Sequence, residues 1–263
     1  MKTNRSVFLS LILSAALVQG TAIINFTADE GFLEGSLDGQ QGWSVPTPAD
    51  ANVVAGGLSY ANGPVVHNGG GQKLSLLGGD ETRISLGLPT TYEADDSFYF
   101  SFLYTHNSGD TFLWFAFAGG ADDDNNSIAA LSRFPTASLR SRVRDTGQSE
   151  QGGSLLPNDQ THLIVGEVSF GGDSAVSTLT LWLNPDSLDK SEVATDIVDP
   201  GRNIGIAELN TLWIRKGGGD GEGFIDHIMI GDSWEAVVIP EPSTYAALFG
   251  LLALGFLAWR RRR

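Results

Sequence analysis

Carboxylate side chains are the first residues in this sequence that could do chemistry. A retaining glycosidase holds two carboxylates about 5 Å apart, one as acid and base and the other as nucleophile. The nearest pattern is Glu93-Ala94-Asp95, but Phe98 stands where a glutamate would complete a Glu-x-Asp-x-x-Glu arrangement. Glu167 and Asp226 each lie alone on a predicted strand. We therefore predict no catalytic residues and a protein that is not an enzyme; the alternative is a secreted polysaccharide hydrolase or lyase.

The densest group of oxygen ligands is the run 122–126 (DDDNN). Asp122, Asp124 and Asn126 alternate along it like the first ligands of a calcium loop, and Ca2+ takes about six to eight oxygens. The glycine and the distal glutamate of such a loop do not follow. A Ca2+ site and a solvated acidic hairpin tip both remain open, and the second is favoured. The histidines have no metal-ligand spacing and stand at His67, His106, His162 and His227.

Arginines form a second candidate site. Arg140, Arg142 and Arg144 occupy alternate positions, so a strand would place their guanidinium groups on one face. Guanidinium groups pair with carboxylates through two parallel hydrogen bonds, which suits an acidic polysaccharide. The alternative, which we favour, is a solvated face balanced by Asp145 and the acidic run 122–126.

Two tryptophans are candidate sugar contacts. Trp182 shares a strand face with Thr180, and Trp213 shares one with Thr211 and Arg215. One interpretation is that the rings on these polar faces are exposed and that a sugar can stack on them. The alternative, which we favour, is that loops cover these faces and the rings belong to the core.

Strands are the elements that must position these residues. Runs with apolar residues at every second position predict them, whereas no segment predicts an amphipathic helix of ten or more residues. Glycine clusters separate the runs, and no internal linker divides the chain. We predict one all-β domain over 23–238, an antiparallel jelly-roll sandwich. Its clearest strands are 97–104 (SFYFSFLY), 111–118 (TFLWFAFA), 163–170 (LIVGEVSF), 178–183 (TLTLWL), 211–215 (TLWIR) and 224–230 (FIDHIMI).

The N-terminus has the pattern of a secretory signal peptide over 1–22. Lys2 and Arg5 precede an apolar run over 7–18, and small residues follow. We predict cleavage after Ala22, with cleavage after Gly20 as the alternative.

The C-terminus has the pattern of a membrane segment. The apolar run 245–259 gives about 22 Å of helix, short for a hydrocarbon core of about 30 Å. Trp259 suits a membrane interface, and the arginines after it predict a cytoplasmic end. They are Arg260, Arg261, Arg262 and Arg263.

Residues 239–263 resemble the PEP-CTERM sorting signal of bacterial surface proteins. The resemblance rests on Pro240, Glu241 and Pro242, then the short apolar helix, then the arginine cluster. It implies cleavage near the motif by an exosortase, a membrane-embedded cysteine protease, in bacteria that make exopolysaccharide. An ordinary single-pass anchor with a proline-containing stalk is the alternative.

The domain itself resembles LamG-like, concanavalin-type jelly rolls. The segments that carry the resemblance are 35–43 (GSLDGQQGW), 181–185 (LWLNP) and 226–234 (DHIMIGDSW). This fold hosts sugar binding, protein adhesion and glycoside hydrolysis, so it does not decide the function.

Composition excludes several classes of protein. Of 263 residues, 31 are acidic, 16 are basic and none is cysteine, which argues against nucleic-acid binding, disulfides and thiol chemistry. The prediction is an exported protein, transiently anchored in the inner membrane and then moved to the cell surface or matrix. We expect a structural or adhesive role with weak glycan binding, and an exosortase and exopolysaccharide as partners.

Overall fold

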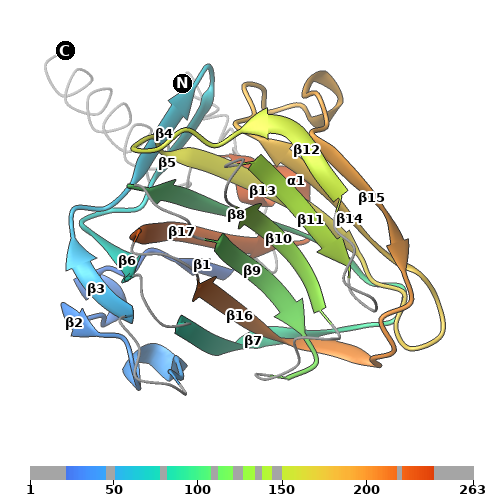
Figure 1. Cartoon of the computed structure of the whole chain (residues 1–263), viewed down its shortest axis with the longest axis horizontal. Helices are drawn as coiled ribbons and strands as arrows, with labels where there is room; N and C mark the ends of the chain where they lie inside the picture. The colour runs from blue at the N-terminus through green and yellow to red at the C-terminus, as the bar shows by residue number, and fades with distance from the viewer. Residues whose placement is uncertain are drawn as a thin grey trace, which may run out of the picture.

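The fold is an antiparallel β-sandwich of two sheets (Figure 1). The computed structural model describes residues 22–45, 51–77, 82–107, 112–120, 127–133, 138–143, 150–217 and 221–239. A sheet of nine strands packs against a sheet of six, and a two-stranded hairpin lies outside them. The predicted all-β sandwich is confirmed.

The nine-stranded sheet, called the large sheet below, contains both ends of the described chain. Its internal strand β17 pairs with β8 on one side and with β6 and the short β1 on the other. In sheet order the strands are β15 (Ile197–Arg202), β14 (Ser177–Leu183), β13 (His162–Ser169), β8 (Ser97–His106), β17 (Gly223–Gly231), β6 (Gln72–Leu76), β3 (Ala51–Ala55) and β2 (Gly35–Ser36), with β1 (Ala22–Ile24) on β17.

The six-stranded sheet, called the small sheet, faces the viewer in Figure 1. Its order is β12 (Glu150–Leu155), β11 (Ser138–Val143), β10 (Ser127–Arg133), β9 (Phe112–Ala118), β16 (Glu208–Gly217) and β7 (Thr82–Glu93). Strand β9 pairs with β10 and β16, so the apolar run at 111–118 is an internal strand. The sequence predicted this, because the run is apolar on both of its faces.

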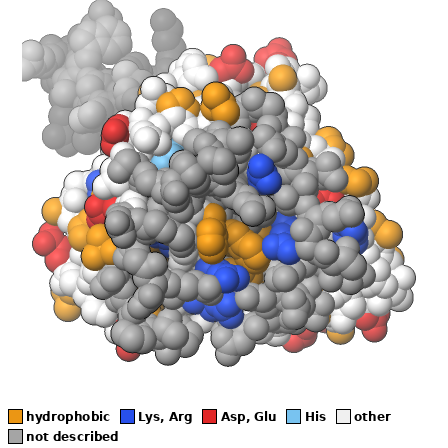
Figure 2. Space-filling model, viewed as in Figure 1, with side chains coloured by type: hydrophobic (Ala, Val, Ile, Leu, Met, Phe, Trp, Pro, Cys, Tyr) orange, Lys and Arg blue, Asp and Glu red, His pale blue; other side chains and the backbone are white. Residues whose placement is uncertain are grey.

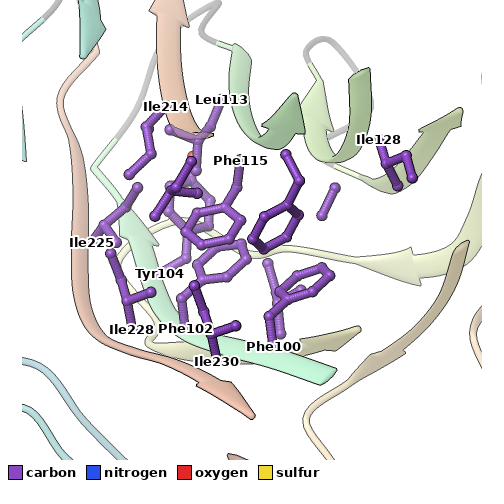
Figure 3. Packing of buried hydrophobic residues seen from close by; sticks show 14 of the residues in the cluster. Phe100, Phe102, Tyr104, Leu113, Phe115, Ile128, Ile214, Ile225, Ile228 and Ile230 are labelled. Atoms are coloured by element: carbon purple, nitrogen blue, oxygen red, sulfur yellow. The ribbon is translucent and has the colours of Figure 1, made fainter. Parts of the chain in front are cut away.

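Aromatic side chains fill the space between the sheets. Phe98, Phe100, Phe102 and Tyr104 alternate along β8 and point to one face, as the sequence predicts. The ring of Phe102 stacks on that of Phe115 from β9 with centroids 4.1 Å apart. Figure 3 shows Phe100, Phe102 and Phe115 gathered between the sheets. Burying each such ring stabilises the fold by about 1.5–3 kcal/mol, so this layer is the main core.

A second apolar cluster covers the outer face of the large sheet. It lies under the hairpin of β4 (Ser59–Asn62) and β5 (Val65–Asn68) and under helix α1 (Trp234–Val238). Trp182 belongs to this cluster: it is 2% exposed, and its ring meets that of Trp234 edge-on at 5.1 Å. The favoured interpretation, a covered ring that belongs to the core, therefore holds for Trp182, because segments distant in sequence cover its face.

Helices are few and short in the described part of the chain. Three are single 3-10 turns, η1 (Ala28–Glu30), η2 (Gln40–Gly42) and η3 (Lys190–Glu192). Helix α1 has five residues and is capped by Ser233, whose side-chain oxygen accepts a hydrogen bond from the Ala236 amide. No helix among these is long and apolar enough to cross a membrane. Residues 1–21 of the predicted signal peptide and the run 245–259 lie outside the described residues, so both segments stay predictions. Ala22, the last residue of the predicted signal peptide, is described as the first residue of β1.

Candidate ligand-binding face

The outer face of the small sheet gathers aromatic and cationic side chains over a floor of small residues. The floor is made by Ala116, Ala118 and Ala129, which pack with Trp213 in a separate apolar cluster. Because side chains alternate along strands, Trp114, Ala116 and Ala118 point to this outer face, while their chain neighbours Phe115 and Phe117 point into the core. Figure 2 shows hydrophobic side chains bordered by Lys and Arg near the middle of this face.

Trp114 is the centre of the arrangement. The Arg142 guanidinium carbon lies 4.8 Å from the centroid of its ring, and that of Arg215 lies 5.0 Å away. Arg142 comes from β11 and Arg215 from β16, two strands that do not pair with each other. The Trp114 ring therefore contacts two guanidinium groups that come from separate strands. Such contacts contribute about 0.5–1 kcal/mol each where they are solvated and more where they are not.

Further rings and cations extend the set. Trp213 lies 5.8 Å from Trp114, and the guanidinium of Arg83 from β7 lies 5.5 Å from the Trp213 ring. Phe112 completes it, 6.0 Å from Trp114 and 5.5 Å from Arg215. We call Phe112, Trp114, Trp213, Arg83, Arg142 and Arg215 the aromatic–arginine cluster.

Trp213 is not an open stacking platform. It is fully buried, as the favoured interpretation of a covered ring predicts. Its indole N–H nevertheless has no hydrogen-bond acceptor among the described residues. A buried donor without an acceptor costs about 1–3 kcal/mol.

The alternation correctly places two of the three arginines on one strand face, whereas their contact with a polysaccharide stays a prediction. Arg140 and Arg142 lie on the outer face of β11, opposite Leu131 and Ala129 of β10. Arg144 lies outside the described residues. Sequence reasoning missed Arg83 and Trp114 as members of this face because they come from other strands. Trp114 was detectable, since it alternates with Phe115 in a strand that is apolar on both faces.

The metal prediction falls outside the structure. Asp122, Asp124 and Asn126 are not among the described residues, so a Ca2+ site there stays a prediction. Within the described ranges no three His, Cys, Asp or Glu side chains are placed to hold a metal ion.

A buried polar cluster surrounds Asp226 at the bulge in β17. Its carboxylate accepts hydrogen bonds from the backbone amides of Leu58, at 2.8 Å, and His227, at 2.7 Å. Burial raises the pKa of Asp226 to about 8 despite these bonds, and the nearby Glu30 carboxylate adds to the rise. Asp226 is fully buried, so it ties the hairpin to β17 instead of facing a groove.

Two histidines lie in the same cluster. The rings of His67 and His227 are 5.0 Å apart, and His227 Nδ1 lies 2.6 Å from Asn25 Oδ1. Burial, with the charge of the other histidine second, lowers the pKa of His67 to about 3. Burial lowers the pKa of His227 to about 4. Both rings are therefore neutral at neutral pH.

Two other described carboxylates, those of Glu167 and Glu30, are paired with structural partners. Glu167 accepts from the Tyr99 hydroxyl at 2.6 Å and from Lys190 Nζ at 2.7 Å. Both oxygens of Glu30 accept from Asn25. Glu30 also lines a hollow of about 190 Å3 together with Ile23, Ile24, Phe32, Gln41, Trp43 and Leu86. In this hollow the carboxylate is single, so its lining does not form a two-carboxylate site.

Comparison of the sequence with known families identifies a sorting motif at the C-terminus. Residues 238–263 match the model of the PEP-CTERM protein-sorting motif. The chain carries a PEP-CTERM sorting motif. This motif indicates an exported protein that is sorted to the cell surface through a C-terminal anchor, and it implies processing by an exosortase. The sequence matches no curated protein.

Solved structures with a similar fold include a lectin-like domain, a binding module and an enzyme. The calreticulin globular domain of T. cruzi aligns with 14% identity and a TM-score of 0.49, covering 85% of this chain and 96% of that one. The carbohydrate-binding module CBM66 of Bacillus subtilis aligns with 9% identity and a TM-score of 0.43, covering 74% and 98%. The transglycosylase Crh5 aligns with 11% identity and a TM-score of 0.47, covering 82% and 86%. These likenesses concern the fold and carry no argument about ligand or activity.

Proposed function

We propose that this PEP-CTERM protein is a non-enzymatic, structural or adhesive component of the cell envelope or of an exopolysaccharide matrix. A signal peptide exports it, the segment 239–263 holds it in the inner membrane, and an exosortase then releases or transfers it to the surface. The observation that carries the proposal is the sorting motif at 238–263, which directly follows a folded β-sandwich.

Weak glycan binding at the aromatic–arginine cluster completes the proposal. Guanidinium groups form charge-assisted hydrogen bonds with carboxylates, which acidic sugars carry. Trp114 holds Arg142 and Arg215 in place, so less conformational entropy is lost when they bind a ligand. The alanine floor itself is fully buried, so we propose that a polymer contacts the half-buried arginines above it. Affinity per domain is low, and many copies along one polymer strengthen attachment through multivalency.

The alternative is a secreted polysaccharide hydrolase or lyase on the same fold. It needs two carboxylates that face one groove. Asp226 has the raised pKa expected of a general acid, but it is fully buried and bonded to backbone amides. Asp226 therefore does not supply an accessible general acid, and we propose binding instead of hydrolysis.

Glycan binding is tested with the processed protein on an array of neutral and acidic polysaccharides, with and without Ca2+. We expect acidic polymers to bind and Arg142→Ala to weaken binding about tenfold, the effect of losing a charge-assisted hydrogen bond. Arg202→Ala is the matched control, because Arg202 lies at the end of β15 in the other sheet. Equal binding by both variants would contradict the assignment, and release of new reducing ends would favour the hydrolase.

Sorting is tested separately by replacing Pro240 and Pro242 together with alanine. We expect the variant to keep its C-terminal arginines, whereas the parent loses them. Intact mass of the protein recovered from the producing cells gives the answer. The same mature C-terminus in both proteins would refute recognition through the proline motif.

A further inference from the structure

The β-sandwich is closed by its last described helix, immediately before the sorting signal. Helix α1 packs on β8, β17 and the hairpin strand β5. Trp234, Val237 and Val238 are each at most 2% exposed within the second apolar cluster. The indole of Trp234 donates a hydrogen bond to the carbonyl of Leu188 at 3.0 Å. The domain therefore depends on the chain up to Val238.

Two side chains hold the carbonyl groups at the end of this helix. The Ser101 hydroxyl on β8 donates to the carbonyl oxygen of Val237 at 2.8 Å. His67 Nε2 on β5 lies 3.2 Å from the carbonyl oxygen of Val238. These carbonyls would otherwise be among the unpaired groups that every helix leaves at its C-terminus.

The peptide bond between Val238 and Ile239 is held at both of its polar atoms. Its oxygen is bonded to His67, and its N–H donates to the carbonyl of Glu235 at 3.1 Å. A protease must bind the carbonyl oxygen of the bond it cuts in its own oxyanion site. Here that oxygen already has a buried partner, so cleavage requires α1 to open first.

The sorting motif begins inside this structure. The family match starts at Val238, the last residue of α1, and Pro240 follows Ile239 directly. Only residues 240–244 separate the fold from the apolar run, and they reach about 17 Å when fully extended. The folded domain is thus held within that distance of any membrane that takes up 245–259.

We propose that α1 is a clamp that sets the upstream limit of processing, so that the exosortase cuts only on the C-terminal side of Ile239. This inference rests on the proposed processing. It adds that the folded domain restricts cleavage to the segment between Ile239 and residue 245. Cleavage upstream of Ile239 tracks the small population in which α1 has opened. The clamp also keeps intact the part of the chain that seals the second apolar cluster.

The first test measures the mature C-terminus and the protection of α1 in the full chain. Intact mass of the protein processed in its producing cells should give a C-terminus at Ile239 or later. Hydrogen exchange of the full chain in detergent micelles should show protected amides at Ala236 and Ile239. A mature terminus upstream of Ile239, or α1 amides that exchange like an unstructured peptide, would overturn the clamp.

The second test weakens the clamp and compares it with a matched change elsewhere. Ser101→Ala removes the hydroxyl that bonds Val237, and we expect about 2- to 10-fold faster exchange of the Ile239 amide. It should also add a fraction of molecules that end upstream of Ile239. Ser141→Ala is the control, because it removes an equally buried hydroxyl, bonded to Asp199 at 3.1 Å, between β11 and β15.

The two variants separate the clamp from the processing itself. Equal exchange at Ile239 in Ser101→Ala and Ser141→Ala would refute the clamp. Full-length mass in the parent and in both variants would refute processing, while the exchange data would still decide whether α1 is clamped.

Discussion

Asp226, His67 and His227 show how three ionisable side chains make one neutral interior. Each is at most 3% exposed, and burial moves every pKa toward the uncharged form. The sequence presents them as a lone acid and two scattered histidines, because the β4–β5 hairpin that joins them comes from more than 150 positions earlier in the chain. Their pKa shifts make the folding free energy depend on pH.

We predict that this cluster gives maximal stability near pH 6.5. Both histidines have folded pKa values below the ordinary 6.5, so the unfolded chain binds more protons and stability falls as pH drops below 6.5. Asp226 has a folded pKa of about 8, above its ordinary 3.8, so its contribution is lost as pH rises toward 8. Between pH 4 and 6.5 the two histidines outweigh the aspartate, and the net slope is about 1.4 kcal/mol per pH unit. Urea unfolding of the processed protein across this range measures it.

Asp226→Asn isolates one limb of this profile. It should abolish the decline between pH 6.5 and 8 and steepen the rise below pH 6.5, whatever its own cost in stability. Asp29→Asn, on the exposed turn η1, should leave the profile unchanged. A decline above pH 6.5 that persists in Asp226→Asn would contradict the assignment.

At the scale of elements, β13 has a glycine where the strand must make room for a ring. Gly166 pairs with Phe100 of β8, and a Cβ on Gly166 would meet the Phe100 ring. The ring lies over the bare backbone and continues the aromatic layer between the sheets. Glycine has a low strand propensity, but at this position it leaves the space that the Phe100 ring occupies.

We predict that Gly166→Ala destabilises the fold by about 1–3 kcal/mol, the usual cost of overpacking a core. The control is Gly87→Ala in β7, where a Cβ has open space and the backbone needs no glycine. That change should stay within about 0.5 kcal/mol of the parent. Urea midpoints of the two variants measure the difference, and equal midpoints would show that Phe100 can shift without cost.

The strands were largely predictable from the sequence, but the segments that pack over the outer faces of the sheets were not. Alternation placed Phe98 to Tyr104 on one face and made 111–118 an internal strand, because a strand shows its two faces at every second residue. Trp182 has a threonine neighbour on its face and yet is core, because the hairpin and α1 cover it. Helix α1 was missed because five residues are too few for a periodic signal. The arginines of β11 were found from alternation, whereas their meeting with Trp114 depends on the order of strands in the sheet.

At the scale of the whole molecule, charge is divided between the domain and its sorting segments. Residues 23–239 contain 30 acidic and 10 basic side chains, a net charge of −20, against −15 for the whole chain. Such a charge keeps copies of a domain apart in solution. The aromatic–arginine cluster holds three of those basic residues on one face. The domain therefore has a local group of positive charges although its net charge is strongly negative.

Processing should therefore change the charge of the protein in steps. Loss of Glu241 and the four terminal arginines takes the net charge from −15 to −18, and loss of Lys2 and Arg5 takes it to −20. A cut after Glu241 would give −21 instead. Electrophoretic mobility of the purified species, matched to intact mass, resolves these states. A mature protein with the mobility of the whole chain would exclude removal of either segment.

The position of the two ends of the domain decides how it responds to pulling. Ile23, the first residue after the predicted cleavage site, pairs with Met229 near the end of β17, and α1 begins at Trp234, three residues after that strand ends. Tension between the two ends would pass through this corner and leave the stacked rings between the sheets unloaded. Because the two ends lie close together, the sandwich would lie beside the line of force and contribute little to the extension. Stretching a matrix would therefore detach β1 or α1 before it separated the two sheets.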